Sequence, residues 1–92
     1  MKFEWDQEKN LINQKKHKIS FETAAYVFQD KNYIEMYDFE HSTEEDRYIA
    51  IGCVGEALFV VFTERKENIR LISARLATES ERRLYYDQNI YY

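Results

Sequence analysis

The stretch VFTERKENIRLISARLATESERR, residues 61–83, decides the fold of this 92-residue chain. Its pattern predicts the end of one strand, a polar turn, a second strand over Ile69 to Leu76, and the start of a helix. Thr78 and Glu81 fit a capping box, in which the two side chains satisfy free backbone donors at a helix start. The stretch also holds six of the thirteen Lys and Arg residues: Arg65, Lys66, Arg70, Arg75, Arg82 and Arg83.

Arg70 and Arg75 interrupt an apolar strand at positions where Val or Ile would pack better. Arginine is costly to bury without a partner, so these side chains face a solvated cleft or meet carboxylates. We interpret the stretch as a basic sheet surface for an anionic ligand. The alternative is a set of ion pairs with nearby acids, namely Glu64, Glu67, Glu79 and Glu81. Strand alternation places Arg70 and Arg75 on opposite faces, so both serve one site only if a bulge intervenes.

Upstream of this stretch, three further segments have the pattern of strands. Residues 57–64 are apolar on both faces, which indicates a central strand, and Gly55-Glu56 joins them tightly to residues 47–54. Residues 33–39 predict another strand, followed by an acidic turn over residues 40–46. Together with residues 69–76, these segments predict a four-stranded antiparallel meander.

The N-terminal part predicts a short strand and two helices. Lys2 to Trp5 alternates polar and apolar residues, Asp6 caps a helix over residues 7–18, and Ser20 caps a second helix with an apolar face. The first helix is thin in apolar residues, so we expect it on the surface with Lys9, Asn13, Lys16 and His17 on one side. A terminal helix runs to about Gln88, and Ile90 to Tyr92 form a frayed end or a docking tail. The expected fold is a single α+β domain over residues 1–92, an antiparallel sheet with helices against one face.

Composition excludes several classes of protein. The single cysteine, Cys53, cannot form an internal disulfide, and no Cys/His cluster has zinc spacing, so we expect neither metal nor cofactor. The longest apolar run, residues 57–62, is too short to cross a bilayer, and the charged N-terminus lacks a signal peptide, which indicates a cytoplasmic protein. The net charge of −4 is local, because residues 30–46 hold seven acids and one base, and the remaining 12 bases and 10 acids sum to +2.

Three motifs resemble those of the BrnT toxin family. The string F-E-W-D…K-N…N-x-x-K-H-x-I-S-F spans Phe3 to Phe21, R-Y-I-A-I-G spans Arg47 to Gly52, and F-T-E-R…I-R-L-I-S-A-R-x-A-T…E-R-x-x-Y-Y spans Phe62 to Tyr86. They cover nearly the whole chain in the family's order. Lys18 stands where many relatives have glycine, and a positive φ there would give lysine a steric cost.

The resemblance implies a RelE-like fold and a metal-independent endoribonuclease toxin of a type II toxin–antitoxin pair. It also implies a cognate BrnA-like antitoxin with a ribbon-helix-helix DNA-binding domain. Contact with DNA would then be indirect, through the antitoxin, and the toxin would dimerise within the complex.

RNA cleavage without a metal needs a base for the 2′-hydroxyl, an acid for the leaving 5′-oxygen and cations for the charged phosphorane. The candidate catalytic residues are Lys16, His17, Glu64, Arg65 and Arg75. The candidate RNA-binding residues are Arg70, Arg82 and Trp5, the last through base stacking.

Each candidate also has a structural interpretation. His17 can interact with free carbonyls at a helix end, Glu64 can pair with Arg65 or Arg75, Trp5 can belong to the core, and Arg82 can bind a partner protein. Two functions therefore remain open. One is an endoribonuclease toxin, and the other is a non-catalytic module whose basic sheet surface docks an acidic partner.

Overall fold

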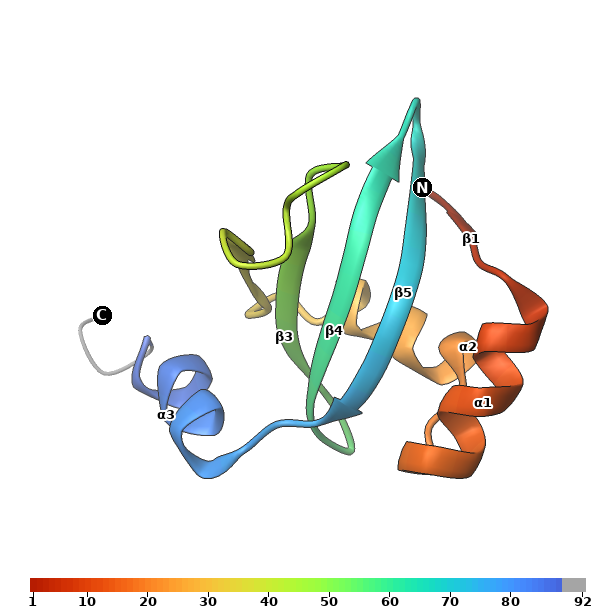
Figure 1. The fold of residues 1–92 in the computed structure, drawn as a ribbon. Coiled ribbons are helices and arrows are strands. Elements are labelled where there is room, and N and C mark those ends of the chain that lie inside the picture. Colours follow the sequence, from red (N-terminus) through yellow and green to blue (C-terminus); the bar gives the residue numbers. More distant parts are fainter. Residues whose placement is uncertain (89–92) are drawn as a thin grey trace.

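The computed structural model describes residues 1–88 and folds them into a five-stranded sheet with helices on both faces (Figure 1). The tail from Ile90 to Tyr92 lies outside the described residues. The elements in chain order are β1 (Lys2–Glu4), α1 (Gln7–His17), α2 (Phe21–Ala24), the 3₁₀ helix η1 (Ala25–Gln29), β2 (Ile34–Tyr37), β3 (Tyr48–Val54), β4 (Glu56–Arg65), β5 (Asn68–Leu76) and α3 (Glu79–Asp87). This order confirms an α+β fold. None of the helices in residues 1–88 is long and apolar enough to cross a membrane.

The sheet is mixed rather than antiparallel. Its strand order is β1-β5-β4-β3-β2, and β2 to β5 pair antiparallel in chain order. β1 runs parallel to β5, with Phe3 opposite Ile69, so the expectation of an antiparallel sheet was wrong. Alternation at residues 2–5 predicts a strand but carries no information about its partner. The four antiparallel strands leave two edges, at β2 and at β5, and β1 occupies part of the edge at β5.

The main core lies between the sheet and the helices α2 and η1. Phe21, Ala24 and Val27 are fully buried against strand residues that include Val60 and Phe62. A smaller core lies on the opposite face, where Tyr85 of α3 packs with Ile51 and Ala57. The expectation that all helices cover one face was therefore wrong, because α3 crosses to the other side of the sheet (Figure 1).

The ends of the helices follow the sequence signals. The Asp6 carboxylate accepts the backbone N–H of Glu8, and the Ser20 hydroxyl accepts that of Thr23. Both hydrogen bonds of the Thr78–Glu81 capping box are present. Lys18 ends α1 in the left-handed region with a φ of 62°, which is the strained conformation expected where lysine replaces glycine.

The buried side of α1 is polar. Asn10 and Asn13 are buried, whereas Leu11 and Ile12 are 53% and 56% exposed, so the expectation of Asn13 on a surface side was wrong. The Asn13 amide donates to the carbonyls of Ile19 and Ala74, both at 2.8 Å, and its oxygen accepts the Ala74 N–H at 3.1 Å. β1 pairs only with residues 68–70 of β5, so Asn13 satisfies backbone groups farther along the same edge.

Candidate functional site

A β-bulge brings Arg70 and Arg75 to the same face of the sheet. Val61 pairs with Ser73, but Phe62 pairs with Leu71, so Ile72 is an extra residue in β5. As a result Arg70 lies opposite Thr63 and Arg75 opposite Phe59. Thr63 and Phe59 are four residues apart on β4, so they point to the same face. The condition set by the sequence, that both arginines serve one site only if a bulge intervenes, is met.

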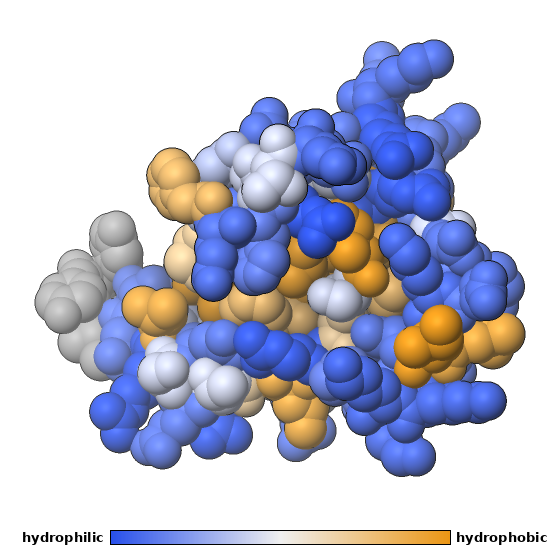
Figure 2. All heavy atoms as spheres, in the orientation of Figure 1, coloured by the Kyte–Doolittle hydropathy of each residue, from blue (hydrophilic) through white to orange (hydrophobic). Residues whose placement is uncertain are grey.

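This face of the sheet is not covered by α2 and η1, and we call it the open face. On β4 it carries Phe59, Val61 and Thr63. Its middle is apolar, with Ile49 of β3 beside Val61 of β4. Figure 2 shows apolar side chains at the centre of the view and hydrophilic side chains around them. α3 borders the open face at one end, and the loop over residues 38–47 borders it at the other (Figure 1).

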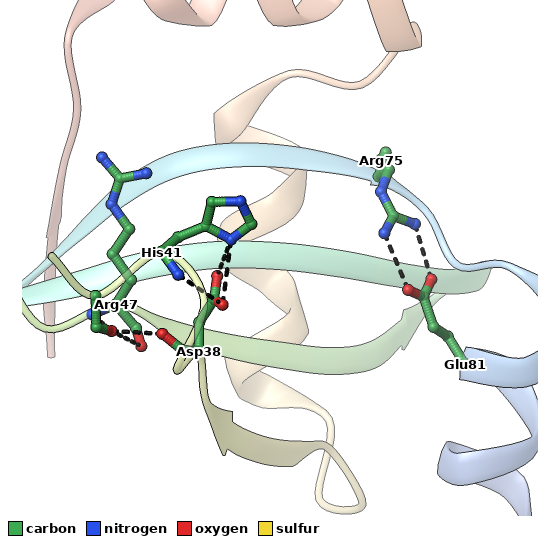
Figure 3. Close-up of polar contacts among 6 residues, drawn as sticks. Asp38, His41, Arg47, Arg75 and Glu81 are labelled. Carbon is green, nitrogen blue, oxygen red and sulfur yellow. Dashed lines mark hydrogen bonds and ion pairs between the residues drawn. The ribbon is translucent and has the colours of Figure 1, made fainter.

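Arg75 is held at the α3 end of the open face (Figure 3). Its two terminal nitrogens donate to the two Glu81 oxygens at 2.8 and 2.9 Å. The guanidinium also lies 3.9 Å from the centre of the Phe59 ring, which is a cation–π contact. The hydrogen bonds from Arg75 hold the pKa of Glu81 below its ordinary 4.5, against the opposing effect of burial. The same contact raises the pKa of Arg75.

The Glu81 contact predicts a specific loss of stability in acid. A carboxylate whose pKa is lower in the folded state contributes stability above its unfolded pKa, and this contribution is lost as the pH falls through the folded value. The melting temperature of the wild-type chain should therefore begin to fall as the pH drops below the ordinary 4.5 and continue to fall until Glu81 takes up a proton in the folded state, at its lowered pKa. In thermal melts, the melting temperature of Glu81→Gln should decrease less over the same pH range, because the variant has no carboxylate at this position. Parallel curves for the two proteins from pH 7 to pH 3 would contradict the assignment.

Arg70 and Arg65 occupy the other half of the open face. Arg70 donates to Glu4 of β1 at 2.8 Å, and hydrogen bonds from Asn68 and Arg70 lower the pKa of Glu4. Arg65 lies 3.7 Å from Glu45, and both side chains are well exposed, so this pair is weak. The three sequence-predicted arginines of β4 and β5 thus share one face, and each has a carboxylate partner.

The loop over residues 38–47 builds a pocket beside Arg65. The Thr63 hydroxyl on the open face donates to the Asp46 carbonyl at 2.6 Å and so fixes the loop to the sheet. The pocket has a volume of about 340 Å³ and is lined by polar side chains: His41, Thr43, Glu44, Glu45, Arg47 and Arg65.

Within this loop, His41 is oriented by a buried carboxylate. Its Nδ1 lies 3.0 and 3.2 Å from the two Asp38 oxygens, and Asp38 is only 9% exposed. Sequence reasoning missed both residues, together with Arg47, because residues 40–46 were interpreted as an acidic turn and Asp38 and Arg47 as parts of the flanking strands. The signal available was the spacing Asp38-x-x-His41, which lets a carboxylate and an imidazole meet in a tight turn.

The remaining candidates lie away from these arginines or at their edge. Glu64 pairs with Ile69 in the sheet and points to the face opposite Arg65, so the structure does not bring it together with Arg75. Trp5 packs edge-on against Phe21 of the main core, at a ring distance of 6.2 Å.

Lys16, His17 and Arg82 lie on helices α1 and α3, each of which contacts the chain near the end of β5 that carries Arg75. Lys16 and His17 follow Asn13 by three and four residues, so they lie one helical turn beyond its contact with Ala74, beside the end of β5 (Figure 1). Arg82 is exposed on α3, next to Glu81.

α3 is anchored through Tyr85 as well as Glu81. The Tyr85 hydroxyl donates to Asp30, whose same oxygen accepts the Cys53 N–H at 2.8 Å. Burial raises the pKa of Tyr85, and the bond to Asp30 raises it further, so the hydroxyl remains a donor. α3 is therefore bound to the sheet through Glu81 in its first half and through Tyr85 in its second half. These contacts hold the Glu81 carboxylate in place beside Arg75. Residues 1–88 contain no group of three His, Cys, Asp or Glu side chains placed to hold a metal ion.

The comparison with known families gives one match. A family model described as "Ribonuclease toxin, BrnT, of type II toxin-antitoxin system" matches residues 5–81. No curated protein sequence matches the chain. The matched range includes the bulged strand β5, the loop over residues 38–47 and the Glu81 partner of Arg75.

Proposed function

We propose that this chain, which belongs to the BrnT family of ribonuclease toxins of type II toxin–antitoxin systems, is an endoribonuclease that binds RNA on its open face. The family description supports ribonuclease activity and a protein antitoxin as partner. The further details that we propose are cleavage without a metal ion and a RelE-like fold.

One observation carries the proposal: the bulge at Ile72 gathers Arg65, Arg70 and Arg75 on one face of a chain whose net charge is −4. A guanidinium binds phosphate oxygens through two parallel hydrogen bonds, as it binds a carboxylate. The carboxylates that now meet these arginines therefore occupy the positions that RNA phosphates would take. The apolar middle of the face and the Phe59 ring offer surface for unstacked bases.

Three arginines cover more length than one phosphate needs. Arg75 pairs with Phe59 across the sheet, and Arg70 pairs with Thr63. Phe59 and Thr63 are four residues apart, which is about 13 Å along the strand. We propose that the strand of RNA runs along this length and that the arginines bind successive phosphates. Lys16, His17 and Arg82 extend the basic surface past the end of β5, and Trp5 and Glu64 belong to the other face.

The partner that we propose is a BrnA-like ribbon-helix-helix antitoxin. An acidic or amphipathic segment of the antitoxin would cover the open face and take the place of RNA. The DNA-binding domain of the antitoxin would remain free to bind DNA. The complex would contain two copies of the toxin. This arrangement explains inhibition through the same arginines that bind RNA.

A second function has one observation in its favour. Arg65, Arg70 and Arg75 each already have a carboxylate partner within the chain. In a non-catalytic module, carboxylates of an acidic partner segment would replace these internal carboxylates on the arginines.

Expression in a bacterium separates the two functions. We expect the chain alone to stop growth and to fragment cellular RNA, and we expect co-expression of the protein encoded by the neighbouring gene to restore growth. The purified chain should cleave single-stranded RNA in the presence of EDTA. Normal growth and intact RNA, with folded protein in the cell, would leave the binding module as the better account.

A further inference from the structure

We propose that His41 is the general base that takes the 2′-hydroxyl proton during RNA cleavage, with Asp38 as its positioning residue. The reacting phosphate would lie in the adjoining pocket, where Arg47 and Arg65 bind it. The inference rests on the ribonuclease activity proposed above, and it assigns the catalytic centre to a loop that supplied none of the sequence candidates.

The loop is fixed before any substrate arrives. The Asp38 N–H donates to the Arg47 carbonyl at 2.9 Å and closes the neck of the loop. The Ser42 hydroxyl donates to the Asp38 carbonyl at 2.6 Å and accepts the Arg47 N–H at 2.9 Å. Thr63 then ties the loop to β4. A catalytic group held by such a network keeps its orientation without further ordering when substrate binds.

The imidazole of His41 has the orientation that a base requires. Asp38 meets Nδ1, which fixes the tautomer with the proton on that nitrogen and leaves Nε2 with a lone pair. Figure 3 shows the other ring nitrogen pointing away from Asp38, and the His41 side chain is 60% exposed. When Nε2 takes a proton, the buried Asp38 carboxylate stabilises the positive ring. The same role belongs to the aspartate of a Ser-His-Asp triad.

Two cations face the same pocket. In the part of the chain that the structure describes, Arg65 pairs only with Glu45, and this pair is exposed, so phosphate can displace that carboxylate. Among residues 1–88, Arg47 has no carboxylate within ion-pair distance. The charged groups that line the pocket with His41 are thus Arg47, Arg65, Glu44 and Glu45. The two arginines supply the charge that a phosphorane needs, and the two glutamates keep the empty pocket close to neutral.

The reaction step balances without an additional reagent. The 2′-oxygen forms a bond to phosphorus as its proton passes to His41 Nε2, and the bond from phosphorus to the 5′-oxygen breaks. The leaving 5′-oxygen takes a proton from water, which leaves a 2′,3′-cyclic phosphate and a free 5′-hydroxyl. His41 then returns its proton to solvent. Arg47 and Arg65 hold the non-bridging oxygens, whose charge grows in the transition state.

His41→Asn tests the proposal. Asparagine can keep a donor toward Asp38 but has no atom at the position of Nε2. We expect kcat for cleavage of an RNA oligonucleotide in EDTA to fall by about 100-fold or more, with KM little changed. Wild-type cleavage should depend on pH through a single base, and His41→Asn should lack that dependence. Asp38→Asn should lower kcat by a smaller factor, because an amide cannot stabilise the charged ring.

Glu40→Gln is the matched control, because Glu40 is an exposed residue of the same loop that does not line the pocket. It should keep the kcat and the pH dependence of the wild-type chain, and thermal melts should show that all three variants remain folded. An active wild-type chain whose kcat and pH dependence survive in a folded His41→Asn overturns this inference alone. A wild-type chain that cleaves no RNA overturns the proposed function and this inference with it.

Discussion

We expect Arg75→Ala to lower kcat/KM for RNA cleavage by about 100-fold and to leave the fold intact. A charge-assisted, bidentate contact to phosphate contributes about 3 kcal/mol at most, and each 1.4 kcal/mol is a factor of ten. Arg75 has the geometry for such a contact, since both of its terminal nitrogens already meet two oxygens of Glu81. The loss of stability should be about 1 kcal/mol, because the pair is partly exposed. An RNA cleavage assay and a thermal melt measure the two effects.

The split between kcat and KM locates Arg75 relative to the reacting phosphate. Arg75 lies at the opposite end of the open face from the His41 pocket (Figure 3), so the loss should be seen in KM. Glu81→Gln keeps the capping box but removes the competing charge, so it should tighten RNA binding. Arg83→Ala is the control, because that arginine forms only an exposed pair with Glu79 on the same helix. A destabilised Arg75→Ala with unchanged specific activity would make Arg75 a structural residue.

Asn13→Ala destabilises the fold by about 3 kcal/mol or more. The substitution leaves three backbone groups without their partner, namely the Ala74 N–H, the Ala74 carbonyl and the Ile19 carbonyl. Each unsatisfied buried group costs about 1–3 kcal/mol. Small domains are stable by only about 5–15 kcal/mol, so the melting temperature should fall by roughly 12 °C or more. Thermal and urea unfolding of the purified variant measure the loss.

Ile12→Ala is the matched control for Asn13, since it shortens an apolar side chain one position earlier in α1. Ile12 is 56% exposed, so its truncation should change the melting temperature little. Asn13→Leu should be as harmful as Asn13→Ala, because an apolar side chain of similar size leaves the same three backbone groups unpaired. Equal melting temperatures for Asn13→Ala and Ile12→Ala would show that water replaces the amide at the edge of β5.

Local signals in the sequence predicted the elements well. The caps at Asp6, Ser20 and Thr78 are where they were expected, and strands β2 to β5 lie within two residues of their predicted bounds. Each of these signals depends on neighbouring residues only. The resemblance to the family raised a positive φ at Lys18 only as a condition, from the glycine that many relatives have there, and the structure meets that condition.

Features that depend on distant residues were predicted less well. The partner of β1 is 66 residues away in sequence, and no local pattern encodes that pairing. Asn13 was placed on a surface side because it shares helical spacing with the polar residues Lys9, Lys16 and His17. It is buried instead, because its amide satisfies the backbone groups of Ala74 at the edge of β5. The His41–Asp38 pair was overlooked for a related reason: the acidic composition of its segment outweighed the spacing of two residues within it.

The pairing of β1 with β5 has a consequence for protein synthesis. The ribosome makes β1 and α1 first, but their partner strand is complete only after residue 76 has emerged. Until then Asn13 has no β5 edge to bind, and the hairpin of β4 and β5 has not formed. Contacts of such long sequence separation form late, because loop closure must precede them. A nascent chain from which residues 68–76 have not yet emerged therefore carries no assembled open face, and the activity proposed for that face would begin only after β5 has formed.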